Sequence, residues 1–334
     1  MNKKKINVLI LEHSLLSNVA WWRTYRPLWV VSKLSDEGLF PVEFNFRVKR
    51  KDLDYSDMWW AHLIIVSRPF AKPYVSDFLV EAKQNGCKII VDIDDDVFNL
   101  PKDHALYSIY KQGSANQKES EKAFKTADLF WYSTDKFLET YSKNGIVVPN
   151  AIFPEEIQAE PAPDRGLWAW RGTTIQYHDI LAPDARKWYT ENRDKAQQWC
   201  FLGVLPPMEH ADNVRTLDYL ESPRQYMDAI QRAQFNGFWK PLTDHPFNEH
   251  KSNIALIEAT MSGGACITNF AGRPGWETAT DTFPTYEKAC ELWQASKELI
   301  STKYNLWNTA QMRAQTMHAL CSPPTATSPN TEGS

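Results

Sequence analysis

The chain is poor in the residues that mark several special classes of protein. It has five cysteines in 334 residues, and they form no Cys-x-x-Cys pair: Cys87, Cys200, Cys266, Cys290 and Cys321. An odd, scattered set of cysteines predicts neither a disulfide framework nor a zinc site, and it fits a reducing cytoplasm. No Gly-x-Gly-x-x-Gly follows the first apolar segment, so the ordinary dinucleotide fingerprint is missing.

Long apolar runs and a strong net charge are also absent. The apolar segment 6–11 follows Lys3, Lys4 and Lys5 and imitates the start of a signal peptide, but Glu12 and His13 interrupt it. We interpret it as a buried strand. No stretch approaches the roughly 18 apolar residues of a membrane span. The net charge of −4 gives no overall field for nucleic acid, although a local basic groove is compatible with it.

What is present is the composition of a globular enzyme. Hydrophobic residues make up 43% of the chain and charged residues 23%, a balance typical of a chain that folds around a core. The length favours two domains. The chain is also rich in tryptophan, with 14, and we expect most of them in cores or interfaces.

The first half alternates short apolar runs with helical patterns. The runs are bounded by polar or turn residues, as strands are, and they fall at residues 6–11, 63–67, 88–93, 129–133 and 146–148. Residues 76–85 predict a helix that ends at Gly86. Strands separated by helices favour parallel pairing in a doubly wound sheet.

The second half repeats this rhythm after a Pro-rich linker at residues 149–163. The predicted strands are residues 168–170, 174–177, 198–202 and 265–269, and residues 253–262 predict a helix closed by Gly263 and Gly264. We therefore expect two α/β domains that face each other across a cleft. Residues 322–334 have almost nothing to bury, so we expect a disordered tail.

The motif with most chemical content is the polar loop that enters this helix. Lys251 and Ser252 stand just before the helix, and its amino terminus offers free N–H groups and a positive dipole end to a phosphate. Glu258 lies just under two turns farther on, where a carboxylate can accept two ribose hydrogen bonds. The spacing of these residues alone favours an ordinary helix, capped by Ser252 and with Glu258 on the surface, over a phosphate-binding one.

The pattern of Phe247, Lys251, Ser252 and Glu258 resembles the donor-binding element of the retaining glycosyltransferases of family 4 and their phage-type relatives. The resemblance implies a GT-B fold, with an acceptor-side Rossmann-like domain at residues 1–150 and a nucleotide-sugar domain at residues 151–321. It also implies a nucleotide-sugar donor, UDP-linked in our expectation, with no required cofactor. Lys251 and residues 252–254 would hold the diphosphate, and Glu258 the ribose.

The same resemblance extends to other parts of the second half. Arg171 and Gly172 are similar to the opening strand and loop of the family's second domain, where the arginine would pair with the diphosphate. A guanidinium suits this task because it binds phosphate oxygens in pairs. An ordinary surface ion pair would explain Arg171 equally well. The loop at Pro241 and Leu242 would touch the nucleobase through its backbone. The full donor-binding set implied by the resemblance is Gly172, Pro241, Leu242, Asn248, Ser252, Asn253, Ile254 and Glu258.

One position departs from the family pattern. Many members carry a second Glu eight residues before the ribose Glu, and His250 occupies that place here. Glu249 or His250 would have to substitute for it.

In the first half, residues 131–134 and 147–151 resemble the end of the family's acceptor domain. Trp22 and Arg23, just after the first strand, are similar to the phage-type members, and Arg23 would face the cleft on the acceptor side.

The acidic turn Asp92, Asp94, Asp95 and Asp96 is open to several interpretations. It can be a metal-binding Asp-x-Asp of another transferase class, and it fits a phosphatase nucleophile loop poorly because Asp96 replaces the expected small residue. The resemblance favours an acceptor-side role without a metal, in which Asp94 or Asp95 holds or deprotonates an acceptor hydroxyl. Helix capping or pairing with arginine is an equal alternative.

The expected activity is retaining transfer of a sugar to a hydroxyl group, in which Arg171 and Lys251 stabilise charge on the departing diphosphate. The acceptor is hydroxymethylated DNA, a glycan or a lipid, and the cytoplasm would be that of a host if the chain is phage-encoded. A protein that binds nucleotide sugars without catalysis is the alternative of another class.

A DNA acceptor would need a basic face with aromatic side chains near it. The candidates are Arg23, Arg47, Lys49, Arg50, Lys51 and Arg68, with Trp21, Trp22, Trp59 and Trp60. A short basic run such as 47–51 is more commonly a solvated loop.

Overall fold

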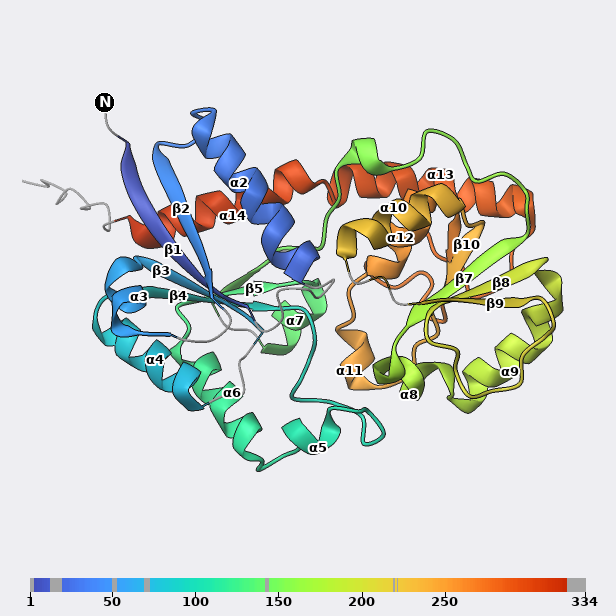
Figure 1. Cartoon of the computed structure of the whole chain (residues 1–334), viewed down its shortest axis with the longest axis horizontal. Coiled ribbons are helices and arrows are strands. Elements are labelled where there is room, and N and C mark those ends of the chain that lie inside the picture. Colours follow the sequence, from blue (N-terminus) through green and yellow to red (C-terminus); the bar gives the residue numbers. More distant parts are fainter. Residues whose placement is uncertain are drawn as a thin grey trace, which may run out of the picture.

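The computed structural model describes residues 3–12, 20–49, 53–68, 73–141, 144–218, 220 and 222–322. These residues form two bodies, each a parallel sheet covered by helices on both faces (Figure 1). The expected pair of Rossmann-like, doubly wound domains is confirmed. Of the expected tail, residues 323–334 lie outside the described residues. No helix in the described part of the chain combines the length and apolarity needed to cross a membrane.

The first sheet has the strand order β2-β1-β3-β4-β5-β6. Its strands are β1 (Lys4–Glu12), β2 (Val42–Lys49), β3 (Leu63–Ser67), β4 (Lys88–Ile93), β5 (Leu129–Tyr132) and β6 (Gly145–Val147). The helices along this part of the chain are η1 (Trp21–Tyr25), α2 (Arg26–Asp36), α3 (Tyr55–Trp60), α4 (Pro73–Gln84), α5 (Tyr107–Tyr110), α6 (Ala115–Thr126) and α7 (Asp135–Tyr141). Alternate residues of β1 pack on opposite faces of the sheet: Val8 and Ile10 belong to one apolar cluster, and Leu9 and Leu11 belong to the other.

Strand β2 was not expected from the sequence. Its residues alternate in burial less cleanly than those of the central strands, and it is an edge strand paired only with β1. The basic run 47–51 therefore begins within a strand, and the solvated-loop interpretation is wrong for Arg47 and Lys49, which both pair with the buried Asp57. Residues 50–52 lie outside the described residues.

The second sheet has the order β11-β10-β7-β8-β9. Its strands are β7 (Leu167–Gly172), β8 (Gln198–Gly203), β9 (Val214–Asp218), β10 (Gly237–Trp239) and β11 (Ala265–Ile267). The helical segments around it are η2 (Pro154–Glu156), η3 (Thr174–Gln176), α8 (Tyr177–Ile180), α9 (Pro183–Asn192), η4 (Arg193–Lys195), α10 (Pro223–Ala233), α11 (Pro246–Glu249), α12 (Ile254–Ser262) and α13 (Tyr286–Lys303).

The strand expected at residues 174–177 is wrong. This segment is helical, because the Thr173 hydroxyl accepts a hydrogen bond from Ile175 N–H and the Gln176 side chain bonds back to Thr173 N–H. Local capping thus turns the chain after β7 although Ile175 and Tyr177 favour a strand.

The last helix, α14 (Leu306–Cys321), returns to the first sheet. Figure 1 shows it beside β1 and α2, and its apolar residues Leu306, Ala310 and Ala314 belong to the core cluster of the first sheet. Residues 306–321 thus pack with residues 1–150, although the sequence division places them in the second domain.

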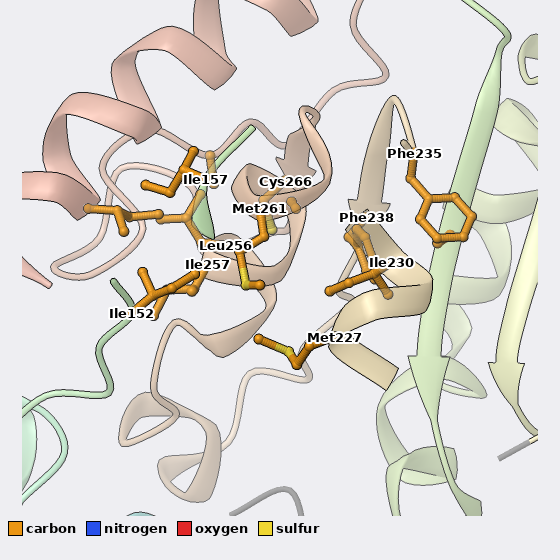
Figure 2. Close-up of a cluster of buried hydrophobic side chains, with 14 of the residues drawn as sticks. Ile152, Ile157, Met227, Ile230, Phe235, Phe238, Leu256, Ile257, Met261 and Cys266 are labelled. Atoms are coloured by element: carbon orange, nitrogen blue, oxygen red, sulfur yellow. The ribbon is translucent and has the colours of Figure 1, made fainter. Parts of the chain in front are cut away.

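The second sheet has its own core, part of which Figure 2 shows. Ile230 of α10, Leu256 and Ile257 of α12 and Phe238 of β10 meet there. This packing fixes α12 against the sheet and so sets the position of the loop of residues 250–253, called here the 250–253 loop.

Candidate functional site

The amino terminus of α12 is free of side-chain caps. Asn253 is the N-cap residue, but its side chain makes no capping hydrogen bond. Ser252 does not cap the helix either, because its hydroxyl accepts a hydrogen bond from Asn150 Nδ2 at 2.9 Å. The first N–H groups of α12 therefore remain available to an anion, and capping by Ser252 is excluded.

Glu258 lies inside the molecule, which contradicts the surface alternative. It is 1% exposed, and the nearest charge is Arg171 at 3.6 Å between Nη1 and Oε1. Neither carboxylate oxygen meets the geometry of a hydrogen bond with any described residue. Burial raises the pKa of Glu258, while Arg171, the Tyr226 hydroxyl and Lys240 act to lower it. A buried carboxylate with open acceptor positions suits a ligand that carries hydroxyl groups.

Arg171 stands at the end of β7, where strand residues face the cleft. The guanidinium also lies over the Tyr226 ring, at 5.2 Å from its centre. An apolar hollow adjoins Arg171 and is lined by Gly203, Leu217, Leu220 and Tyr226, among others. At Gly172 a Cβ atom would lie 2.3 Å from the Trp170 ring, so packing within β7 already requires glycine there.

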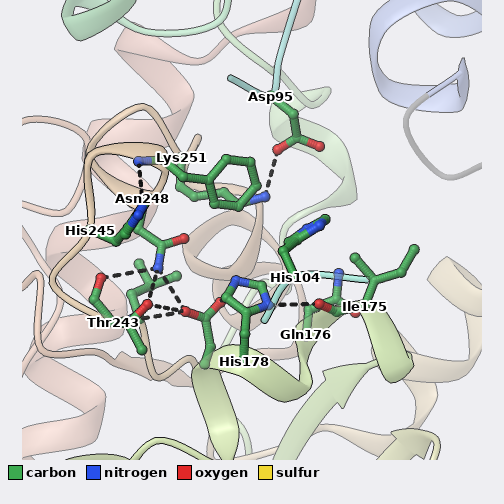
Figure 3. A network of polar contacts seen from close by, with 12 residues as sticks. Asp95, His104, Ile175, Gln176, His178, Thr243, His245, Asn248 and Lys251 are labelled. Atoms are coloured by element: carbon green, nitrogen blue, oxygen red, sulfur yellow. Dashed lines mark hydrogen bonds and ion pairs between the residues drawn. The ribbon is translucent and has the colours of Figure 1, made fainter. Parts of the chain in front are cut away.

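Lys251 bridges the two bodies. Its Nζ lies 2.5 Å from Asp95 Oδ1 (Figure 3). Asp95 in turn contacts Arg68 at 3.0 Å. Burial acts to raise the pKa of Asp95, but Lys251 and Arg68 hold it below its usual range. Asp95 is thus ionised and occupies the position beside Lys251 that a phosphate oxygen can take.

A third cation, Lys240, was missed as a site residue. It follows β10, so it stands at the same edge of the sheet as Arg171, and no carboxylate of the described residues lies within ion-pair distance of it. Burial lowers the pKa of Lys240 to about 8, with Lys251 and Arg171 acting in the same direction. The short apolar segment 237–239 before it was the signal in the sequence, since ligand sites lie beyond the carboxyl ends of strands. Arg171 faces Glu258 and Lys251 faces Asp95, so Lys240 is the one of these three cations without a carboxylate at ion-pair distance among the described residues.

Asn248 supports the 250–253 loop from within. It is fully buried and donates hydrogen bonds to Asp179 Oδ1 at 2.7 Å and to Thr243 O at 3.0 Å (Figure 3). Asp179 also accepts from Thr243 N–H at 2.9 Å. These hydrogen bonds give Asn248 a scaffolding position. Its Oδ1 has no hydrogen-bonding partner among the described residues, and the contact with the nucleotide sugar that the resemblance implied stays a prediction.

The backbone of Leu242 is already engaged. Asn269 accepts from Leu242 N–H at 2.9 Å and donates to its carbonyl at 2.5 Å. Leu242 N–H is therefore already used, and a contact of this loop with a nucleobase through its carbonyl groups stays a prediction. Pro241 has no N–H to offer.

Two histidines to which the sequence assigned no role in the site face each other across the bodies. The rings of His104 and His178 are 4.8 Å apart, and Phe247 packs against both (Figure 3). Burial lowers the pKa of His104 to about 4, and it also lowers the pKa of His178. Both rings are therefore neutral at pH 7. No motif marks His104, because its neighbours come from distant segments.

Arg23 and Trp22, the residues expected on the acceptor side of the cleft, are buried inside the molecule. Arg23 is 2% exposed, donates to Asp92 Oδ1 at 3.0 Å and shares this carboxylate with Arg313, which donates to Oδ2 at 3.1 Å. Trp22 belongs to the core cluster of the second body. The expectation that Arg23 faces the cleft is wrong, because a buried carboxylate draws both guanidinium groups inward.

The other carboxylates of the acidic turn are paired as well. Arg68 binds Asp94 through two hydrogen bonds of 2.7 and 2.8 Å. Asp96 accepts from the Tyr141 hydroxyl at 2.5 Å and lies 3.2 Å from His250 Nδ1. Asp92 and Asp94, the pair of the metal-binding interpretation, thus each hold arginine. No group of three metal-ligating side chains is found among the described residues.

His250, which occupies the place where the resemblance implied a Glu, connects the bodies. It is 3% exposed, and its Nε2 lies 2.9 Å from Thr140 Oγ1 of the first body. Glu249 is exposed and lies 3.8 Å from Lys136.

No family model and no curated protein matches the chain. Among solved structures, the fold is similar to that of a provisionally assigned UDP-N-acetylglucosamine 2-epimerase from Listeria monocytogenes, with a TM-score of 0.52 and 10% identity over 96% of each chain. An α,α-trehalose-phosphate synthase from Burkholderia vietnamiensis reaches a TM-score of 0.48, with 9% identity over 96% of this chain and 100% of that one. WaaG, a glycosyltransferase of lipopolysaccharide biosynthesis, reaches 0.45, with 10% identity over 95% and 97%. The first similarity shows that the chain has the two-domain GT-B fold, and identities this low show the fold alone.

Proposed function

We propose that the chain is a glycosyltransferase that moves a sugar from a nucleotide-sugar donor to a hydroxyl group, with retention of anomeric configuration. The observation that carries the proposal is the juxtaposition of three cations, an uncapped helix amino terminus and a buried carboxylate with open acceptor positions. A nucleoside diphosphate has the matching groups, which are two charged phosphates beside a ribose diol.

The donor would lie along the carboxyl end of the second sheet. Its diphosphate contacts Lys251, Lys240, Arg171 and the N–H groups of residues 252–254. The ribose hydroxyls donate to Glu258.

Catalysis would consist of positioning and charge stabilisation. When the bond between the anomeric carbon and the diphosphate breaks, negative charge grows on the leaving phosphate oxygen, beside Lys251 and the helix end. The acceptor oxygen forms the new bond to the anomeric carbon and gives its proton to the departing phosphate oxygen. Asp95 contacts Lys251 from the first body, and we propose that it orients the acceptor hydroxyl once the phosphate has taken over Lys251.

A saccharide is the acceptor that the charge distribution favours over DNA. Arg47 and Lys49 pair with Asp57, Arg68 pairs with Asp94 and Asp95, and Arg23 is buried. Cations that are neutralised in this way contribute little to the binding of a phosphate backbone. A transfer assay with hydroxymethylated DNA tests this choice, since the DNA hypothesis requires salt-sensitive binding.

The test of the donor site is calorimetric titration with UDP, UDP-glucose and UDP-N-acetylglucosamine. Glu258→Gln keeps the volume but removes the charge, and we expect it to lose about 1.5–3 kcal/mol per ribose hydrogen bond. Lys251→Ala should lose affinity for UDP itself. Lys288→Ala, which removes an exposed ion pair with Glu291, is the matched control and should bind like the parent chain.

Unchanged affinity in both variants, in proteins shown to be folded by circular dichroism, would contradict the donor site. Product analysis then separates the activities: release of the nucleoside diphosphate with a new glycoside supports transfer. Conversion of UDP-N-acetylglucosamine to its 2-epimer without an acceptor would instead indicate an epimerase, the assignment of a protein that shares this fold.

A further inference from the structure

A second cavity lies between the two bodies and is distinct from the hollow beside Arg171. Its volume is about 510 Å³. The first body contributes residues 133–136 at the end of β5, and the second contributes the 250–253 loop and the segment 270–276. The cavity shares Lys251 and Asn253 with the candidate donor site, but Arg171, Lys240 and Glu258 are not part of its lining.

Two buried polar atoms of this lining have no hydrogen-bonding partner in the described part of the chain. They are Ser133 Oγ and Asn253 Nδ2, and the two residues are 3% and 4% exposed. Buried polar groups nearly always have a partner in native proteins. Two such groups, one from each body and both lining the same cavity, point to a ligand that hydrogen-bonds to both.

The charges around the cavity select the class of ligand. Cationic and anionic side chains both line the cavity, with Lys136, Lys251, Arg273 and Lys303 against Asp135, Glu139 and Glu249. An anion would approach three carboxylates, and a cation would approach four basic groups. A neutral molecule with many hydroxyl groups meets neither penalty, because a hydroxyl both donates and accepts.

We propose that this cavity binds a neutral saccharide, as a subsite for the sugar chain of the acceptor. Its volume falls within the range of about 300–1,000 Å³ that is usual for small-molecule sites. Calling this saccharide the acceptor rests on the proposed glycosyl transfer. The 250–253 loop then forms one wall of both sites, so the acceptor saccharide and the donor lie on the two sides of the same short segment.

The experiment is saturation-transfer NMR on the full chain without donor, with lactose, cellobiose, maltose and chitobiose as probes. We expect at least one of them to bind. Ser133→Ala and Asn253→Ala should each weaken binding about two- to tenfold, the effect of one ordinary hydrogen bond. Ser120→Ala is the matched control, because Ser120 is also buried with an unpartnered hydroxyl but lies on α6, outside the cavity lining.

Absence of binding by all four probes, or equal binding by the parent chain and both cavity variants, would overturn the proposal. Titration with UDP in the same samples separates this result from failure of the proposed function. UDP binding without saccharide binding removes only the subsite. Saccharide binding that depends on Ser133, in a chain that binds no UDP, supports the cavity and contradicts the transferase.

Discussion

At the scale of single residues, the main feature of the donor site is that burial disfavours the charged form of its cation Lys240. Burial lowers the pKa of the Lys240 ammonium group to about 8, far below its ordinary value of 10.5. Lys251 and Arg171 add to this by repulsion, while Asp179 and Glu258 oppose it. Such a cluster of like charges is favourable only when an anion joins it, which is what a diphosphate would do.

The pKa of Lys240 predicts how donor affinity depends on pH. The group is protonated below pH 8 and neutral above it, so affinity for UDP should be steady on the acidic side and fall as the pH rises through about 8. Calorimetric titration between about pH 7 and about pH 10 measures this. Lys240→Arg should flatten the profile because arginine stays charged. An unchanged fall in the arginine variant would assign the pH dependence to another group.

The pairing of Asp92 and Asp94 with arginines leads to a prediction about metal ions. Because two arginines hold Asp92 and one holds Asp94, we expect transfer to proceed in excess EDTA at nearly its ordinary rate. The rate with and without added Mn²⁺ is the measurement. Complete loss of activity in EDTA that Mn²⁺ restores would support the Asp-x-Asp interpretation.

At the scale of elements, α12 connects the core to the site. Its buried residues fix it against the sheet, and its amino terminus carries the 250–253 loop. Its carboxyl end is set by Gly263, whose φ of +92° is a conformation that other residues rarely adopt. A Cβ atom there would also lie 2.6 Å from Ala162 N, so the linker packs directly on this turn.

Gly263→Ala should therefore destabilise the chain by more than about 1 kcal/mol, since it adds a steric clash to the cost of the positive φ. Gly272→Ala is the matched control: Gly272 has φ of +78°, but nothing lies within 4 Å of an added Cβ. Urea unfolding of both variants measures the difference. Equal losses would mean that the contact with Ala162 has no energetic weight.

At the scale of the whole molecule, the two bodies are joined by polar contacts at the site itself. Lys251 pairs with Asp95, His250 contacts Asp96 and Thr140, and Asn150 donates to Ser252. Asp95 and a donor phosphate would compete for the same ammonium group. Binding of the donor is thus coupled to the contact between the bodies.

Asp95→Asn should strengthen UDP binding about two- to fivefold, because it removes the competing carboxylate from a partly exposed ion pair worth up to about 1 kcal/mol. Calorimetry measures the affinity. Asp77→Asn, which removes the exposed pair with Lys122 inside the first body, should change nothing. Weaker UDP binding in the Asp95 variant would mean that Asp95 positions Lys251 for the donor instead of competing with it.

The sequence by itself determined the local features of this protein. Apolar runs such as 63–67 and 88–93 are strands because they are buried on both faces, and the helix before Gly263 and its loop are visible from spacing alone. Only the tertiary structure decided which charged side chains pair with one another. Arg23 is drawn inward by Asp92, and Lys251 meets Asp95, because contacts between residues far apart in the chain leave no periodic trace in it. Strand β2 and the helical turn after β7 also escaped prediction, since an edge strand lacks full burial and a side-chain cap can override the propensity of the residues that follow it.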